Sequence, residues 1–169
     1  MTFTVQKKHK LDHDRSFLDP IDRRILVALQ RDARLSLADL ADEARTSVPS
    51  LQRRLKRLRE DGVILREVAL VDPARSETPM TMILSVEIER ESLDQLDGFR
   101  RRARADPSVQ QCFCVTGDTD FILIVVVKDM PDFERFTHRF FFQNGNVRRY
   151  RTSVVITHDK IGLELPFDT

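Results

Sequence analysis

The sequence predicts an α+β fold made of two domains. Up to residue 64, apolar residues recur at helical spacing in three short segments. From residue 80 onward, strand-like apolar runs and amphipathic helical segments follow in the order βαββαβ. A polar stretch punctuated by Pro73 and Pro79 separates the two patterns, so we place the domain joint there. We expect a tail at 1–17, a helical domain at 18–64, a linker strand and joint at 65–79, and a second domain at 80–169.

The first two predicted helices each have a recognisable start. Asp19 and Pro20 open the first helix, because proline is tolerated where no backbone N–H is needed. Ser36 opens the second, and Asp39 three residues later makes a start similar to a capping box. The apolar positions are Ile21, Ile25, Leu26 and Leu29 in the first helix and Leu37, Leu40, Ala41 and Ala44 in the second.

The third predicted helix carries most of the local positive charge. Ser47 is its expected N-cap, Pro49 fits the first turn, and Gly62 ends it. Its leucines share one face, and its cationic side chains lie opposite and beside them. From Arg45 to Arg66 the chain has seven Lys or Arg against two acidic residues, a local balance of +5 in a chain whose net charge is +1. The positive charge is therefore focused on one segment.

Two short helices joined by a tight turn, the second of them cationic, form the layout of a helix-turn-helix DNA reader, plain or winged. Ser50, Gln52 and Arg53 lie near the start of the reading helix, where such a domain meets base edges, and Lys56 and Arg57 suit phosphates. The predicted DNA-binding residues are Arg45, Ser47, Ser50, Gln52, Arg53, Lys56 and Arg57. For Arg54, beside the apolar stripe, an internal ion pair with Asp22 is favoured over a DNA contact. The alternative for the whole segment is a solvated amphipathic helix.

The second domain is predicted to have a ferredoxin-like architecture. Two strand-helix-strand units with a central hairpin give a four-stranded antiparallel sheet that carries both helices on one face. The strands are expected at 80–89, 109–116, 121–127 and 147–156, and the helices at 92–105 and 131–142. The single core stripes of the helices are Leu93, Leu96, Phe99 and Ala103 in the first and Phe133, Phe136 and Phe140 in the second.

The other face of this sheet indicates self-association. The strand Ile122–Val127 is apolar on both faces, although the helices cover only one of them. A half-covered sheet this apolar needs a second subunit, so we expect a homodimer with facing sheets. Phe140 belongs to the core stripe, whereas Phe141 and Phe142 cannot both be buried in one subunit and are candidates for assembly.

The loop from Thr116 to Asp120 is a candidate ligand site. Gly117 lets the backbone come close, exposed amides can bind a carboxylate, and Asp118 or Asp120 can meet an ammonium group. A zwitterionic amino acid presents both groups. The same residues also suit an ordinary hairpin turn, and the loop by itself favours that interpretation over a ligand site.

Several stretches together resemble the Lrp/AsnC, or feast/famine, transcriptional regulators. They are Leu18–Leu26, the helix-turn-helix that ends in Arg53–Leu58, Asp61–Ile64 and Val115–Phe121. The resemblance covers about residues 18–160. Two departures stand out: Arg45-Thr46-Ser47 replaces a turn that in the family often reads Gly-Leu-Ser, and Thr119 replaces a frequent aromatic residue.

The resemblance implies a sequence-specific regulator of amino-acid metabolism or transport whose dimers join into octamers in many members. It also implies an effector, an amino acid, bound between subunits beside the Gly-Asp loop. The implied effector residues are Thr116, Gly117, Asp118, Thr119 and Asp120, with Met130 and Thr152 as further candidates at the border of the cleft. The alternatives are an effector-independent architectural protein that wraps DNA and, from another class, a ferredoxin-like metabolic sensor or enzyme.

The remaining residues weigh against other functions. The chain shows no nucleophile with a base, no phosphate loop and no metal-ligand spacing, so we expect no enzyme, metal or cofactor. An RNA-binding domain of the same βαββαβ order would need an aromatic platform that Phe113 and Phe121 do not make.

Cys112 and Cys114 are expected to be small buried apolar residues. The following arginines are expected on a solvated helix face, with a DNA track as the alternative: Arg100, Arg101, Arg102 and Arg104.

The composition sets the compartment that we expect. Charged residues make up 33% of the chain and hydrophobic residues 41%, as in ordinary globular proteins. No apolar run is long enough to cross a bilayer, and the first ten residues lack the apolar segment of a secretory signal. We therefore expect a cytoplasmic protein with double-stranded DNA as its partner. The cluster Lys7, Lys8 and Lys10 in the tail is a secondary candidate for a DNA-contacting arm.

Overall fold

The computed structural model describes residues 18–89, 93–142 and 147–168. They divide into two units, one comprising the described residues up to Val68 together with the segment from Gly162 onward, the other running from Ala69 to Ile161. The expected tail with Lys7, Lys8 and Lys10 lies outside the described residues. Among the helices that the structure describes, none combines the length and apolarity that a bilayer span requires.

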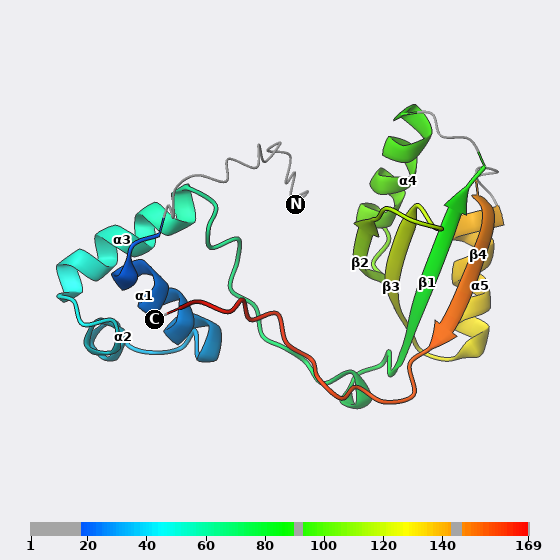
Figure 1. Cartoon of the computed structure of the whole chain (residues 1–169). Helices are drawn as coiled ribbons and strands as arrows, with labels where there is room; N and C mark the ends of the chain where they lie inside the picture. The colour runs from blue at the N-terminus through cyan, green and yellow to red at the C-terminus, as the bar shows by residue number, and fades with distance from the viewer. Residues whose placement is uncertain (1–17, 90–92, 143–146, 169) are drawn as a thin grey trace. The chain divides into compact units, whose positions relative to one another are not determined.

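The first unit contains the three predicted helices, α1 (Pro20–Arg31), α2 (Leu37–Glu43) and α3 (Val48–Glu60) (Figure 1). The predicted caps are confirmed: the Ser36 side chain accepts from the Asp39 amide, and the Ser47 side chain accepts from the Ser50 amide. A full capping box forms at α1, where the side chains of Asp19 and Asp22 each accept the other's backbone N–H.

These helices enclose one small core. Buried side chains come from all three helices and from the C-cap of α2: Ile25, Leu26, Ala28, Leu40, Ala41, Ala44, Leu51, Leu55 and Leu58. Gly62 follows α3 with a φ of 71°, a conformation in which glycine carries no Cβ penalty. The predicted apolar faces of the helix-turn-helix are thus the faces that pack.

The C-terminal segment belongs to the first unit, although we expected the second domain to run to residue 169. Phe167 packs against the helical core, and the Gln30 side chain of α1 bonds the Leu165 backbone twice. The Gln30 amide nitrogen donates to the Leu165 carbonyl at 3.1 Å, and its oxygen accepts the Leu165 N–H at 2.7 Å. The chain therefore leaves the first unit near Val68 and returns to it near Gly162.

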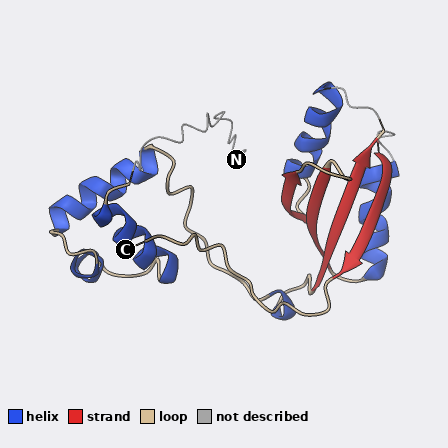
Figure 2. Cartoon of the chain, in the orientation of Figure 1, coloured by secondary structure: helices blue, strands red, loops and turns tan. Residues whose placement is uncertain are grey.

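The second unit is the predicted ferredoxin-like domain. Its elements are β1 (Met80–Ile88), α4 (Leu93–Ala105), β2 (Val109–Cys114), β3 (Phe121–Val127), α5 (Met130–Phe141) and β4 (Val147–Val154). The strands form one antiparallel sheet in the order β2-β3-β1-β4, with both helices behind it in Figure 2. The expected helix start at Ser92 and the stretch 143–146 lie outside the described residues.

The helix-facing side of the sheet forms the second core. Leu84 of β1 and Leu123 of β3 are paired in the sheet and buried beneath the helices. Phe99 of α4 stacks on Phe121 of β3 with ring centroids 4.5 Å apart. Of the consecutive phenylalanines after Phe140, Phe141 is buried, whereas Phe142 is 66% exposed, as the sequence predicts for a single subunit.

Two sequence expectations were wrong in detail. The segment 65–72 forms no strand in the described chain, because no neighbouring strand accepts its backbone N–H groups, and only a short 3-10 turn at Pro73–Arg75 follows. Cys114 is exposed rather than buried because β2 is an edge strand, while Cys112 is half-buried.

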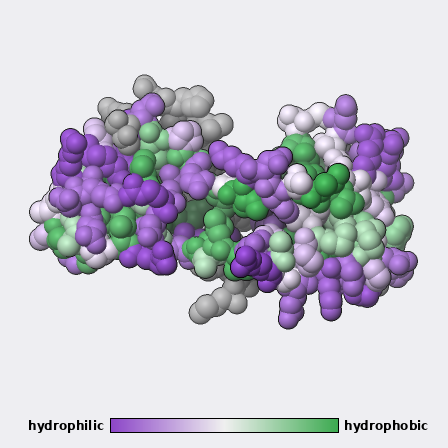
Figure 3. Space-filling view, turned by 90° about the horizontal axis from the view of Figure 1, so that it is seen from below, coloured by the Kyte–Doolittle hydropathy of each residue, from purple (hydrophilic) through white to green (hydrophobic). Residues whose placement is uncertain are grey.

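Figure 3 shows hydrophobic patches on the otherwise hydrophilic face seen from below. Large exposed apolar side chains include Leu65, Val68, Leu70, Val71, Ile156, Ile161, Leu163 and Leu165.

Candidate nucleic-acid interface and effector loop

The start of α3 presents the predicted base-reading residues to solvent. Gln52 and Arg53 are exposed, and neither has a hydrogen bond or ion pair with another described residue. Ser47 is used as the cap of α3, with its Oγ 3.4 Å from the Ser50 amide nitrogen. Exposed amide and guanidinium groups near the N-terminus of such a helix suit adenine and guanine edges in the major groove.

Further along α3 the cationic side chains differ in their surroundings. Lys56 is exposed and has only a loose pair with Glu60, 3.8 Å away at one helical turn. Such a pair contributes little in water, so Lys56 remains available to a phosphate. Arg59 instead pairs with Glu67 at 2.7 Å, just beyond the helix.

A buried carboxylate organises the side of α3 that faces α1. Asp22 is 1% exposed and accepts from Arg54 Nη1 at 2.8 Å. This contact confirms the predicted internal ion pair of Arg54, and Asp19 is a second partner at 2.6 Å. Asp22 Oδ2 accepts from Arg57 Nη2 as well. Arg57, which we predicted as a phosphate contact, thus holds α3 to α1, and its 44% exposed side chain leaves part of the guanidinium accessible.

The pKa shifts in this network follow from its contacts. Burial opposes ionisation of the Asp19 carboxyl, but hydrogen bonds from the Asp22 amide and from Arg54 outweigh it, so the pKa of Asp19 lies below its ordinary value. The hydrogen bonds to Asp19 and Asp22 raise the pKa of Arg54. Both ions are therefore charged throughout the physiological range, and the network is a fixed part of the domain.

Arg53 and Lys56, two exposed cations of α3, should affect DNA binding differently. Replacing Arg53 with Ala should lower the discrimination between operator and random DNA by about 1–3 kcal/mol, because we expect Arg53 to contact a base. Replacing Lys56 with Ala should weaken the binding of operator DNA and of random DNA equally and make both affinities less dependent on salt concentration, because we expect Lys56 to contact a phosphate. Fluorescence anisotropy on both DNAs over a range of salt concentrations measures these quantities.

Arg34→Ala is the matched control, because Arg34 lies outside α3 and its side chain is 91% exposed. It should leave discrimination and salt slope unchanged. Equal losses of discrimination in the Arg53 and Lys56 variants would reject the separate roles.

The loop between β2 and β3 is tied to β1 by two of its residues. Thr119 Oγ1 donates to the Val86 carbonyl at 2.7 Å. Asp120 Oδ2 accepts the Ile88 N–H at 2.7 Å, and the Asp120 amide donates to Val86. The pairing of β1 with β4 shifts register beside Ile88, so Asp120 satisfies an amide at an irregularity of the sheet. Asp120 is therefore a structural residue, a role that sequence reasoning missed because its partner lies on another strand.

The tip of the loop is open. Thr116, Gly117 and Asp118 are exposed, and their amides donate to no acceptor among the described residues. Gly117 has a φ of 117°, a conformation open to glycine. The Asp118 carboxylate is exposed and has no ion-pair partner in the described part of the chain.

The two further effector candidates do not join this loop within one chain. Met130 begins α5, beyond the opposite end of β3 from the loop. A strand of seven residues spans about 20 Å, so the loop and Met130 are separated by roughly that length. Thr152 lies on the edge strand β4, opposite Leu84. A site that used all of these residues would have to combine more than one chain.

The described part of the chain also shows the surroundings of possible metal ligands, of the two cysteines and of the α4 arginines. Ranges 18–89, 93–142 and 147–168 contain no group of three His, Cys, Asp or Glu placed to hold a metal ion. Arg100 Nη2 lies 3.4 Å from Cys114 Sγ, and burial raises the pKa of the neighbouring Cys112 thiol. Arg100 and Arg102 also lie over the rings of Phe121 and Phe99, so these two arginines pack on their own domain.

Comparison with protein families agrees with this geometry. Residues 18–64 match a winged helix-turn-helix DNA-binding family, and residues 81–162 match the Lrp/AsnC ligand binding domain. An HTH-type transcriptional regulator of Sinorhizobium fredii is 42% identical over 89% of this chain and 89% of its own length. The leucine-responsive regulatory protein of Haemophilus influenzae is 32% identical over 85% of this chain and 86% of its own.

Solved structures show the same likeness. An AsnC family transcriptional regulator from Agrobacterium tumefaciens superposes with a TM-score of 0.82 at 34% identity, covering 88% of this chain and 97% of its own. A transcriptional regulator from Neisseria meningitidis in complex with L-Met gives a TM-score of 0.81 at 30% identity, over 88% and 96% of the two chains. With a cationic reading helix, a ferredoxin-like second unit and relatives this similar along nearly their full length, the protein belongs to the Lrp/AsnC family of DNA-binding transcriptional regulators.

Proposed function

We propose that this regulator controls genes of amino-acid metabolism or transport in the cytoplasm and that an amino acid bound at the Thr116–Asp120 loop modulates its binding to DNA. The observation that carries the proposal is the open loop tip. Unused backbone amides there can receive a carboxylate, and the exposed Asp118 carboxylate can receive an ammonium group. The L-Met complex of the Neisseria meningitidis protein supports an amino acid as the ligand class.

We further propose that the functional unit is a homodimer and that dimers assemble further, up to an octamer. The sheet face away from the helices supports dimerisation, since Ile83 is 38% exposed there and Phe113 49%. On the central strand β3, Ile122, Ile124 and Val126 share this face and are only partly covered. A second copy of the sheet would bury these side chains. A site between chains would also let residues that are separated within one chain line a common cleft.

The experiment that tests the function is a titration of the protein onto DNA from upstream of its own gene, with excess random competitor, repeated with each of the twenty amino acids. A shift of the binding curve with one or a few amino acids would establish an effector-gated regulator. Specific binding that ignores all twenty would favour the effector-independent architectural alternative. Absence of specific binding would reject the role of α3 as a reading helix.

Substitutions at the two aspartates of the loop should have different effects, one on ligand binding and the other on stability. Asp118→Ala should abolish the response to the effector without changing the free energy of unfolding, because the exposed Asp118 side chain has no hydrogen bond or ion pair with a described residue. Asp120→Ala should instead destabilise the second unit by about 1–3 kcal/mol, because the Ile88 amide loses its acceptor. Effector titrations and urea unfolding of both variants measure the two effects.

Asp118→Asn is the companion variant, since it keeps the size of the side chain and removes its charge. It should respond to the effector as weakly as Asp118→Ala does. A full response in both variants would exclude Asp118 from the site, whatever the result for Asp120.

A further inference from the structure

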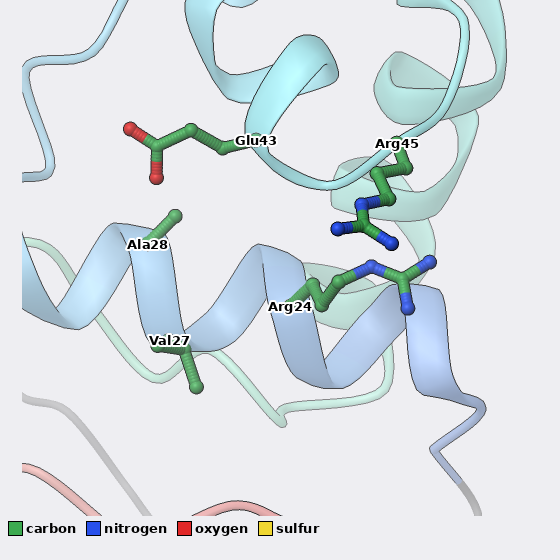
Figure 4. A pocket seen from close by; sticks show the side chains of 5 residues that line it. All are labelled: Arg24, Val27, Ala28, Glu43 and Arg45. Carbon is green, nitrogen blue, oxygen red and sulfur yellow. The ribbon is translucent and has the colours of Figure 1, made fainter. Parts of the chain in front are cut away.

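A pocket of about 330 Å³ lies within the first unit, and its lining includes Arg45, one of the residues that we predicted to bind DNA. Arg24, Val27 and Ala28 of α1 line one wall, and Glu43 and Arg45 at the end of α2 line the other. Figure 4 shows the guanidinium groups of Arg24 and Arg45 on the same side of this pocket, with Glu43 on the other. The two cations thus come from different elements and converge on one opening.

The positive charge in this pocket is not compensated within the described chain. Glu43 is already engaged, because Arg31 Nη2 donates to its two carboxylate oxygens at 2.6 and 2.5 Å. Arg24 Nε donates to the Ala44 carbonyl at 3.0 Å, which fixes the guanidinium and leaves its terminal nitrogens to the pocket. Arg45 makes no side-chain hydrogen bond or ion pair with another described residue. Two neighbouring guanidinium groups without an acidic partner favour an anion between them.

The backbone of Arg45 is the second observation. Its φ is 53°, the one positive value at a non-glycine position among the described residues. The turn dictates this conformation, since the Arg45 amide donates to Asp42 and the next amide, that of Thr46, donates to Ala41. A side chain with a Cβ costs about 1 kcal/mol or more in the left-handed region, where glycine would cost little. The Arg45 backbone therefore carries strain, and strained residues of this kind cluster at binding sites.

We propose that Arg24 and Arg45 form a binding site for a phosphate-type oxyanion. Guanidinium groups present paired N–H donors that match phosphate oxygens, and two of them, one from α1 and one from the turn after α2, can hold one anion from two directions. Val27, which is 37% exposed, and the buried Ala28 add apolar surface beside the two guanidinium groups. The phosphate can come from the DNA backbone or from a free phosphate or phosphate ester. Neither source depends on the amino-acid effector.

The test measures inorganic pyrophosphate binding to the full chain by calorimetry, with chloride at equal ionic strength as the reference. The variants are Arg24→Gln and Arg45→Gly, and Arg34→Gln is the control because Arg34 lies in the same unit outside the pocket. Saturable binding by the wild type and the control should weaken about tenfold or more in either pocket variant. Glycine relieves the strained φ, so Arg45→Gly should unfold at the same or a higher temperature than the wild type.

The same proteins are titrated onto operator DNA over a range of salt concentrations. The measured slope is that of the logarithm of the DNA-binding constant against the logarithm of the salt concentration. A decrease of about 0.9 in the magnitude of this slope in both pocket variants assigns the site to a DNA phosphate. Unchanged slopes, with pyrophosphate binding lost only in the pocket variants, assign it to a free phosphate. Unchanged slopes together with no pyrophosphate binding, or equal losses in Arg34→Gln, would overturn the proposal. A missing response to amino acids would leave all of these readouts intact, so it would bear on the proposed function alone.

Discussion

Replacing Asp22 with Ala should destabilise the DNA-binding unit by about 3–5 kcal/mol, the cost of removing one partner from a buried ion pair. Asp22 is 1% exposed and serves three groups: the Arg54 and Arg57 guanidinium groups and the Asp19 amide. Its loss leaves the 17% exposed side chain of Arg54 with Asp19 as its remaining partner and releases Arg57. The same change breaks the capping box of α1.

Urea unfolding followed by far-ultraviolet circular dichroism measures this effect. Asp22→Asn should lose less stability, because the amide oxygen can still replace one of the two carboxylate oxygens and accept either from Arg54 or from the Asp19 N–H. Asp42→Ala is the control, since this exposed carboxylate of α2 has no ion pair with a described residue. A loss below about 1 kcal/mol in Asp22→Ala would mean that the network contributes no more than an exposed surface pair.

Replacing Ile124 with Asp should convert the proposed dimer into monomers and weaken operator binding by a factor of about 100 to 10,000. Ile124 lies on β3 opposite Ile83, on the sheet face that the helices leave uncovered. A carboxylate there meets water in the monomer but would be desolvated between two facing sheets. Because two linked reading domains bind two half-sites with one association step, loss of the dimer removes that advantage.

Light scattering after size-exclusion chromatography gives the mass, and anisotropy on operator DNA gives the affinity. Gln110→Asp is the control, because it introduces the same charge at an exposed position of edge strand β2. It should leave mass and affinity unchanged. An Ile124→Asp protein that stays dimeric would place the interface elsewhere and remove the main support for facing sheets.

The local order of elements could be predicted because it depends on contacts within a few residues. Helical spacing of Leu51, Leu55 and Leu58 defines a face whatever lies against it, and Ser36 and Ser47 cap helices through amides only three residues away. Strand alternation and hairpin signals are equally local, so the ferredoxin-like order followed from them. The Arg54 ion pair was predictable too, because a cation beside a leucine stripe needs an acidic partner on the packed helix.

Other features depended on partners far apart in the sequence. Arg57 and Asp22 are brought together by the packing of α3 on α1, and Asp120 meets the Ile88 amide only because β1 and β3 are neighbours. No periodicity indicates that Phe167 packs against the first unit or that Leu165 pairs with Gln30.

The sequence by itself thus determined the helices, the four strands of the sheet, the apolar faces that these elements bury and the cationic face of α3, since each follows from local spacing and charge. The tertiary structure alone decided which charged groups stay exposed. It left Arg53, Lys56 and Asp118 open to ligands and committed Arg57 and Asp120, in whole or in part, to holding the fold. The physical reason is that a side chain's availability depends on which groups folding brings within hydrogen-bond distance, and those groups come from distant parts of the chain.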